Sequence, residues 1–379
     1  MKKKAVAVML SIALSAAMLV GCGTDGSAEV VGDTTAVEDS GQSEDADEAE
    51  EQEVADAAQQ EEDEADNEES QDVAAEAEDD YEAVDVKIGS LKGPTSMGLV
   101  YLMDQAEKNE AANNYEFKMV ATADELLPSM ISGDLDIVLV PANVASVLYN
   151  KTEGAVSVID INTLGVLYIV SGDDTIQSME DLKGRTVYLT GKGTTPDYVL
   201  QYLLKENGLT EDVTLEYKSE ATEVAAVLTE TPEVVGVLPQ PYVTAACAQN
   251  ENLAVVLDLT KEWASVQGEG GSSLVTGVTV VRNAFLEENK AAVDKFLEEH
   301  AASADFANEH VEEAAELVAA AGIIEKAPVA AKAMPKCNIT YIDGTDMKTA
   351  LSGYLEVLFE QDASSVGGSL PNDDFYYIK

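Results

Sequence analysis

Two short loops of matching sequence, one hundred residues apart, constrain the fold of this chain more than any other feature. Residues 92–95 read Lys-Gly-Pro-Thr, and residues 192–195 read Lys-Gly-Thr-Thr. Each loop follows a short apolar run typical of a β-strand and precedes an apolar helical pattern. Because the amino end of a helix has unpaired N–H groups and partial positive charge, each loop would direct such an end toward a ligand. The pair therefore predicts two lobes that face each other across a shared cleft.

The amino-terminal residues read as an export signal rather than as part of the fold. Three lysines precede an apolar run over residues 5–20 that is short for a membrane span. The run leads into Leu-Val-Gly-Cys, with the cysteine at position 22. This ending resembles a bacterial lipobox, which implies that residues 1–21 are removed and that a lipid on Cys22 anchors the protein to the membrane. The alternative is an uncleaved amino-terminal helix with an incidental cysteine.

A strongly acidic segment follows the export signal. Residues 23–85 contain 27 Asp and Glu residues and no Lys or Arg. Such a segment repels itself and has too little apolar surface to offset its chain entropy, so we predict a disordered, extended tether over residues 22–85. An acidic interaction tail or a calcium-binding tract is the alternative, although the glycine-turn spacing of a calcium loop is absent.

The rest of the chain, residues 86–379, is long enough for two lobes and is itself acidic. It carries 45 acidic and 19 basic side chains, a net charge of −26, which makes it unsuited to binding nucleic acid. Cys247 and Cys337 are too few for a disulfide framework and fit no metal-ligand spacing, so we predict free thiols. His300 and His310 lie in a charged helical stretch, where we expect solvated positions rather than zinc ligands or acid–base catalysts. We therefore expect no metal and no cofactor.

Apolar β-like runs alternate with helical patterns along this region, which predicts an α/β fold. A capping-box pattern at 122–125 predicts a helix that stops at Gly133. Thr195, Pro196 and Gly208 are expected to cap, begin and end another helix. Strands are expected over residues 86–90, 115–120, 135–140, 157–161, 165–170, 186–189, 234–238, 253–257 and 276–282. Helices are expected from about 95 to 108, and over 122–132, 143–150, 197–207, 223–229, 241–250, 284–321 and 347–359.

Several segments together resemble a known family, the substrate-binding proteins of ABC transporters of the nitrate/taurine/sulfonate and thiamine-precursor type, as found in Firmicutes lipoproteins. They are the lipobox, Gly-Asp-Leu-Asp-Ile at 133–137, Asp-Leu-Lys-Gly-Arg-Thr-Val at 181–187, Leu-Pro-Gln-Pro-Tyr at 238–242 and Thr-Gly-Val-Thr-Val-Val-Arg at 276–282. The resemblance implies a type II periplasmic-binding-protein fold, in which two crossover strands join two α/β lobes with a ligand cleft between them. On this template the first lobe comprises residues 86–170 and 276–379, the second lobe comprises 171–275, and strands 165–170 and 276–282 connect them.

The resemblance also implies a function. It is that of the extracytoplasmic solute-binding component of an ABC importer, which closes its lobes on a small molecule and delivers it to permease and ATPase subunits. We expect a monomer, lipid-anchored at the extracellular face of the cytoplasmic membrane, with an anionic or heteroaromatic ligand. A ligand sensor for a membrane receptor and, third, an enzyme on the same fold are the alternatives. The cysteine-rich motif of the thiamine-precursor synthases is absent, and neutral Gln240 stands where many relatives have an acid.

Sequence signatures of enzymes are absent from the chain. Residues 191–195 lack the four-residue gap of a P-loop, and Pro196 stands in place of the last glycine of a dinucleotide-binding motif. No Gly-x-Ser-x-Gly elbow occurs, and neither histidine has a convincing nucleophile partner. We therefore do not expect an enzyme.

Ligands of open α/β sheets bind beyond the carboxyl ends of the strands, and segments 91–97, 122–124, 141–143 and 190–195 meet that condition. Their hydroxyl, amide and N–H groups can hold a carboxylate, a phosphate or a ring heteroatom. The candidate ligand-binding residues are Lys92, Thr95, Ser96, Asn143, Lys192, Thr194 and Thr195, with Gln240, Tyr242 and Ser272 from the second lobe and Tyr168 as a stacking surface.

Each candidate also has an ordinary structural interpretation. Lys92 and Lys192 can be solvated loop lysines, and Thr95 and Thr195 can be helix caps, a role that is compatible with ligand contact. Tyr168 can be core packing. We expect Trp263 to be a half-buried anchor for its loop rather than part of the cleft.

Overall fold

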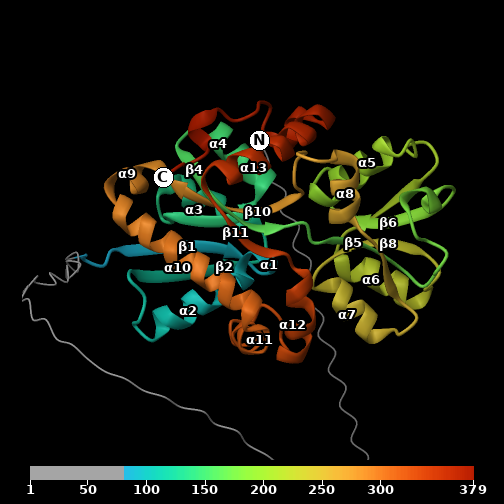
Figure 1. Cartoon of the computed structure of the whole chain (residues 1–379), viewed down its shortest axis with the longest axis horizontal. Coiled ribbons are helices and arrows are strands. Elements are labelled where there is room, and N and C mark those ends of the chain that lie inside the picture. Colours follow the sequence, from blue (N-terminus) through green and yellow to red (C-terminus); the bar gives the residue numbers. More distant parts are fainter. Residues whose placement is uncertain (1–80) are drawn as a thin grey trace, which may run out of the picture. The chain divides into compact units, whose positions relative to one another are not determined.

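The computed structural model describes residues 81–379, so the expected export signal and nearly all of the expected tether lie outside the described residues. The described residues form two β-sheets covered by helices (Figure 1). The first sheet contains β1 (Asp85–Leu91), β2 (Asn114–Val120), β3 (Ile137–Pro141), β4 (Val156–Leu164), β10 (Val275–Arg282) and β11 (Ile339–Ile342). The second sheet contains β5 (Leu167–Ser171), β6 (Thr186–Thr190), β7 (Thr214–Lys218), β8 (Val235–Pro239) and β9 (Ala254–Asp258). We call the parts built on these sheets the first lobe and the second lobe.

The two sheets share a topology. The first has the strand order β11-β4-β10-β3-β1-β2, and the second has the order β7-β6-β8-β5-β9. β1 pairs in parallel with β2 and β3, just as β6 pairs in parallel with β7 and β8. β10 then runs antiparallel to β3, as β5 does to β8. The Lys-Gly-x-Thr loops after β1 and β6 therefore leave equivalent strands, which is the arrangement that their matching sequences predicted.

Helices cover both faces of each sheet (Figure 1). The first lobe contains α1 (Pro94–Met97), α2 (Val100–Glu107), α3 (Leu127–Ser132), α4 (Ala142–Lys151), α9 (Asn283–Glu288), α10 (Lys290–Glu309), α11 (Val311–Ala320), α12 (Ala327–Ala333) and α13 (Gly344–Gln361). The second contains α5 (Thr195–Glu206), α6 (Ala221–Glu230), α7 (Tyr242–Gln249) and α8 (Leu259–Gln267). Short 3-10 turns lie at η1 (Ala123–Glu125), η2 (Met179–Leu182), η3 (Met334–Lys336), η4 (Ala363–Val366) and η5 (Asp373–Phe375).

The strand β3 shows how the sequence builds the core of the first lobe. Its side chains alternate between the two faces of the sheet. Val138 and Val140 belong to the apolar cluster that also contains side chains of α4 and α13. Ile137 and Leu139 belong to a second cluster, which contains Phe296 of α10. A strand that is buried on both faces needs a continuous apolar run, and β3 has one.

The chain passes between the lobes at residues 165–166 and again at 268–274, between α8 and β10. Strand 165–170 is expected to leave the first lobe, with the lobe boundary after residue 170. In the structure the boundary comes earlier, because β5 already pairs with β8 and β9 of the second sheet. The run is buried throughout, so its sequence carries no face pattern that could assign it to one sheet. Two contacts tie residues after α12 to this crossing: Asn338 Nδ2 donates a hydrogen bond to Gly165 O, and Tyr168 OH donates one to Lys336 O at 2.8 Å.

Several local predictions were confirmed and others need correction. The capping box at Thr122 and Glu125 is present, and Gly133 ends α3 in the left-handed conformation at φ 82°. The helix expected from residue 95 to 108 is instead α1 and α2, separated at Gly98, in keeping with the poor helix propensity of glycine. Thr194 rather than Thr195 is the N-cap of α5. Strands β7 and β11 and helix α8 were not predicted, and the stretch 284–321 is three helices.

His300 is buried, not solvated as predicted. Its side chain has 0% exposure, and its Nδ1 lies 3.2 Å from Asp160 Oδ2. Thr279 Oγ1 donates a hydrogen bond to the other oxygen of this carboxylate at 2.7 Å. Asp160 lies in β4, 140 residues before His300, so the sequence of the charged helix carries no sign of this buried partner. The expectation for Trp263 was also wrong in degree, because this side chain in α8 is only 1% exposed.

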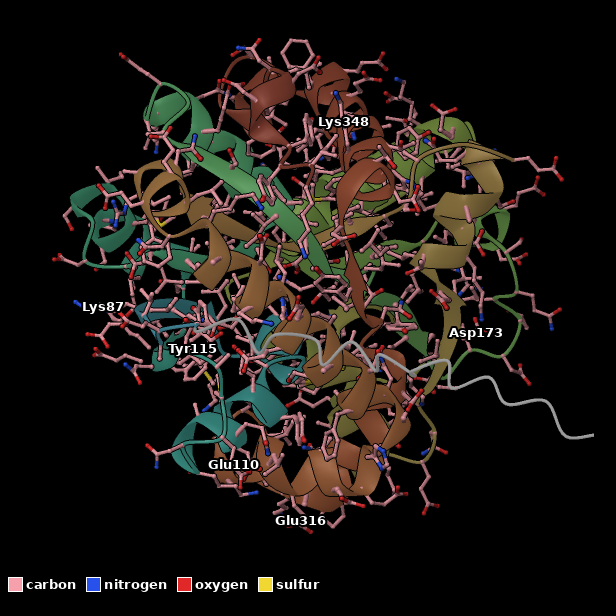
Figure 2. All side chains as sticks on the ribbon, turned by 60° about the vertical axis from the view of Figure 1, so that its left-hand side comes forward. Lys87, Glu110, Tyr115, Asp173, Glu316 and Lys348 are labelled. Carbon is pink, nitrogen blue, oxygen red and sulfur yellow. The ribbon has the colours of Figure 1, made fainter. Side chains whose placement is uncertain are left out.

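Cys247 and Cys337 are free thiols, as predicted. Within residues 81–379, none of the helices combines the length and the apolar character needed to cross a membrane. Charged side chains such as Lys87, Glu110 and Glu316 extend from the surface of the first lobe (Figure 2).

Candidate functional site

The carboxyl ends of β1 and β3 meet β10 at one edge of the first sheet. Gly277 of β10 pairs in register with Pro141, the last residue of β3, and with Thr163 of β4. A Cβ atom at position 277 would lie 2.6 Å from Thr95 Cγ2 and 2.5 Å from Asn162 Oδ1. Glycine therefore lets Thr95, from the segment after β1, lie directly against the sheet edge. Thr95 is thus held near the start of α4, which follows Pro141 immediately.

The hydroxyls of Thr95 and Ser96 shape the turn after β1. Thr95 Oγ1 donates a hydrogen bond to Leu91 O at 3.2 Å, and Ser96 Oγ donates one to the same oxygen at 2.5 Å. Both side chains are buried, and their oxygens keep acceptor capacity. α1 itself has only four residues, so the long helix that begins at this edge is α4.

The two lobes meet at the amino ends of α4 and α5. Thr195 Oγ1, in the first turn of α5, donates a long hydrogen bond to Asn143 Oδ1, in the first turn of α4, at 3.4 Å. Neither helix has a side-chain cap, because the N-cap of α4 is Pro141 and the Thr194 hydroxyl donates instead to Gly191 O. Two helix ends with uncapped N–H groups therefore converge, one from the carboxyl end of β3 in the first sheet and one from the carboxyl end of β6 in the second.

Asp197 fixes the loop that precedes α5. Its side chain is 3% exposed, and its Oδ2 accepts a hydrogen bond from the backbone N–H of Gly193 at 2.7 Å. Its Oδ1 accepts from Tyr217 OH at 2.7 Å. Asp197 thus holds the loop in one shape, and its charge in the first helical turn complements the helix dipole. Lys192 remains exposed, with its Nζ 5.2 Å from the centre of the Tyr217 ring.

The other predicted residues lie in varied surroundings. Lys92 and Thr194 are exposed loop residues, which leaves the solvated interpretation of Lys92 open. Tyr168 is 6% exposed and donates to Lys336 O, and burial together with Asp258 and Cys337 raises the pKa of its hydroxyl to about 12. This arrangement agrees with the core-packing interpretation of Tyr168 rather than with a stacking surface.

Gln240 and Tyr242 lie at the start of α7. Gln240 is 1% exposed, and its Oε1 accepts hydrogen bonds from the Thr244 hydroxyl at 2.8 Å and from the Thr244 backbone N–H at 3.4 Å, in the first turn of α7. Tyr242 is 40% exposed and lines a pocket of about 420 Å³ between α7 and the segment before α12. The lining residues are Pro241, Tyr242, Ala245, Ile323, Ile324, Glu325, Lys326 and Val329. This largely apolar pocket spans the two lobes at α7 and α12.

Sequence reasoning missed Tyr354, which lies beside the meeting point of α4 and α5. Its ring is 0% exposed and packs against Trp263 of the second lobe, with ring centres 5.6 Å apart. Gly353 lies against Ser272, because a Cβ atom there would be 2.8 Å from Ser272 Cβ. The helical periodicity of 344–361 marks Tyr354 only as a core position, and no local pattern indicates that it lies between the lobes.

Thr95, Asn143, Thr195 and Ser272 are therefore the predicted residues that the structure places at or near this junction, together with Tyr354. The site has no arginine, because the chain has only two and each forms an ion pair at the opposite end of its strand. Arg185 Nη1 lies 2.7 Å from Asp173 Oδ2 just before β6, and Arg282 Nη2 lies 2.8 Å from Asp136 Oδ1 just before β3. A ligand at the junction would be held by uncharged donors. The described residues contain no cluster of three His, Cys, Asp or Glu side chains placed to hold a metal ion.

Comparisons with known proteins agree on the fold. Residues 108–260 match the protein family described as "ABC transporter, phosphonate, periplasmic substrate-binding protein". A structure described as an ABC transporter from Parabacteroides distasonis is 24% identical, with a TM-score of 0.65, over 78% of this chain and 99% of that one. The periplasmic aliphatic sulphonate binding protein of Escherichia coli is 16% identical, with a TM-score of 0.60, over 76% and 92% of the two chains.

A ligand-binding component of an ABC-type import system from Staphylococcus aureus is 16% identical, with a TM-score of 0.57, over 78% of this chain and 97% of that one. No curated protein sequence matches the chain significantly. The described part therefore has the fold of periplasmic substrate-binding proteins, as the resemblance implied.

Proposed function

We propose that this chain is the substrate-binding component of an ABC transporter and that it captures a small molecule at the junction of α4 and α5, a proposal that its fold and the family match over residues 108–260 support. The observation that carries the proposal is the contact between Thr195 and Asn143. It joins the two lobes beyond the carboxyl ends of β3 and β6, and open α/β sheets bind their ligands beyond the carboxyl ends of strands.

Lobe closure supplies the mechanism. Only interactions that are stronger in the closed state shift the equilibrium between open and closed forms. A ligand bound by donors of both helix ends makes such interactions, because one end belongs to each lobe. The closed form then presents the ligand and a joined surface of both lobes to permease and ATPase subunits.

The ligand class follows from the donors. Uncapped helix ends and hydroxyls suit an oxygen-bearing group of a carboxylate, sulfonate, phosphonate or heteroaromatic compound. The earlier expectation of loop lysines as partners has less support, because Lys92 and Lys192 are exposed and Lys192 lies over Tyr217.

The proposal also includes the location of the protein in the cell. A lipid on Cys22 would hold the binding domain at the extracytoplasmic face of the membrane, with residues 22–85 as the spacer. Metabolic labelling with a radioactive fatty acid tests this step, since a Cys22→Ser variant would lose both the label and the membrane association.

Native mass spectrometry of the purified protein, followed by small-angle scattering, tests capture itself. We expect a co-purifying small molecule, and a smaller radius of gyration when the stripped protein is saturated with it. An unchanged radius at saturation would contradict closure, and turnover of the bound compound would revive the enzyme alternative.

A further inference from the structure

The hydroxyl of Tyr354 is a buried polar group without a partner at the junction of the lobes. Its residue is 0% exposed, and the oxygen has no hydrogen-bond partner among the residues that the structure describes. Burial raises the pKa of this phenol, and Thr195 acts in the opposite direction, so the Thr195 side chain lies close by. The geometry between the two hydroxyls nonetheless falls short of a hydrogen bond.

The neighbouring donors are already engaged. Thr195 donates to Asn143 Oδ1, and Asn143 Nδ2 donates to Ser365 O at 3.3 Å. Trp263 Nε1 donates to Ser272 O at 2.8 Å. The side-chain hydroxyl of Ser272, like that of Tyr354, is buried and unpartnered within the described residues. Tyr354 therefore has a free hydroxyl close to Thr195, and Ser272, which has another, lies against the neighbouring residue of α13, Gly353.

An unpartnered buried hydroxyl destabilises a protein unless some other molecule satisfies it. Here the available groups are hydroxyl donors and helix N–H groups, with no arginine at the junction. This combination suits an acceptor oxygen with a single negative charge or none, because the lysines of the two flanking loops, Lys92 and Lys192, are exposed to solvent.

We propose that Tyr354 is a ligand-binding residue that donates its phenolic hydrogen to an oxygen of a monoanionic ligand, of the sulfonate or carboxylate class. The inference rests on the proposed function and adds a residue and a charge class to it. Tyr354 belongs to α13 of the first lobe and contacts the second lobe through Trp263, so this hydrogen bond forms where closure brings the lobes together.

The test compares Tyr354→Phe with Tyr149→Phe in the full chain. The Tyr149 hydroxyl has a partner, since it donates to Asp374 Oδ1 at 2.5 Å within the first lobe. Isothermal titration with ethanesulfonate measures affinity, and calorimetry of the ligand-free protein measures Tm. We expect Tyr354→Phe to weaken ethanesulfonate binding by about tenfold or more without lowering Tm. We expect the opposite pattern for Tyr149→Phe, with Tm lowered and affinity unchanged.

Three results would overturn the inference. If Tyr354→Phe bound ethanesulfonate with wild-type affinity, the phenol would not belong to the binding site, and the proposed function would be unaffected. A lower Tm in Tyr354→Phe would show that the hydroxyl bonds to the protein itself. Failure of the wild type to bind ethanesulfonate would refute the charge class, and native mass spectrometry of the co-purified molecule would then decide the proposed function separately.

Discussion

Thr195 Oγ1 of the second lobe donates a hydrogen bond to Asn143 Oδ1 of the first lobe at 3.4 Å. The bond is long, so closure does not depend on it alone, and a ligand oxygen between the helix ends could compete for the same donor. It is nevertheless a side-chain contact between the first turns of α4 and α5, the helices that follow β3 and β6.

Thr195→Val tests this contact, because valine keeps the shape of threonine and removes the hydroxyl. We expect ligand affinity to fall about 2- to 10-fold, the usual worth of one hydrogen bond. Titration with the co-purified ligand measures the change. Thr194→Val is the matched control, since the Thr194 hydroxyl donates only to Gly191 O and should leave affinity unchanged. Equal losses in both variants would assign the effect to the loop rather than to the contact.

Thr95→Ala tests the other loop. Thr95 lies against Gly277 at the edge of the first sheet, and its hydroxyl donates to Leu91 O. If the two loops are a functional pair, Thr95→Ala should also weaken binding of the co-purified ligand by a few fold. An effect confined to Thr195 would mean that the repeated Lys-Gly-x-Thr sequence reflects local turn structure alone.

Gly277→Ala should disturb the packing of Thr95 at this same edge of the first sheet. The new methyl group would lie 2.5 Å from Asn162 Oδ1 and 2.6 Å from Thr95 Cγ2, so Thr95 or β10 must move. Overpacking of this kind costs about 1–3 kcal/mol of the free energy of unfolding, which denaturant titration measures. Gly268→Ala differs in kind, because its φ of 71° causes strain while no atom lies within 4 Å of a Cβ there. A loss of ligand affinity in Gly277→Ala alone would separate the packing of Thr95 from general destabilisation.

How far the sequence predicts this molecule is clearest at β3 and β5. The run at 135–140 is predicted as a strand and is one, because a continuous apolar run between a Gly-Asp turn and a proline is typical of a buried strand. The run at 165–170 is also predicted as a strand, one that leaves the first lobe, but the predicted lobe boundary after residue 170 comes too late, because β5 belongs to the second sheet. Local periodicity determines the type of an element, whereas its partner strands depend on contacts that are distant in sequence.

The residues of the candidate site also divide into those that the sequence predicts and those that it does not. Thr95, Asn143 and Thr195 were predicted because each follows a strand, and the carboxyl ends of parallel strands meet at one edge. Tyr354 and the pair of His300 with Asp160 were not predicted, because Trp263 lies about ninety residues before Tyr354 and Asp160 lies 140 residues before His300. Tyr354 approaches the site from a helix near the carboxyl end of the chain, and in the sequence it shows only the periodicity of a core position.

The ion pair of Asp173 and Arg185 makes a pH prediction. Hydrogen bonds from Thr175, followed by those from Arg185, lower the pKa of Asp173 from 3.8 to about 2. Because the folded-state pKa is depressed, the stabilisation is fully present above about pH 4 and is lost as pH falls toward 2. Asp173 lies in the second lobe, away from Lys87 of the first (Figure 2).

Asp173→Asn should therefore lower Tm at pH 6 and flatten the decline of Tm between pH 4 and 2. Differential scanning calorimetry across that range measures both effects. Asp174→Asn is the control, since the neighbouring carboxylate makes no ion pair in the described structure. Parallel curves for wild type and Asp173→Asn would show that this carboxylate is not a source of the acid sensitivity.

The two thiols of the described domain should differ in reactivity. Burial raises the pKa of Cys337 to about 12, and burial also raises that of Cys247, whose side chain is partly exposed. With a pKa of about 12, only about one Cys337 in ten thousand is a thiolate at pH 8, and the residue is 0% exposed. In a Cys22→Ser background, a thiol reagent at pH 8 should modify Cys247 slowly and Cys337 only at the rate of unfolding.

Mass spectrometry of the labelled peptides separates the two sites, and denaturant should make both react completely. Prompt labelling of Cys337 in the native protein would show that the segment after α12 opens without global unfolding, and absence of both thiols after denaturation without reductant would reveal a disulfide between the lobes.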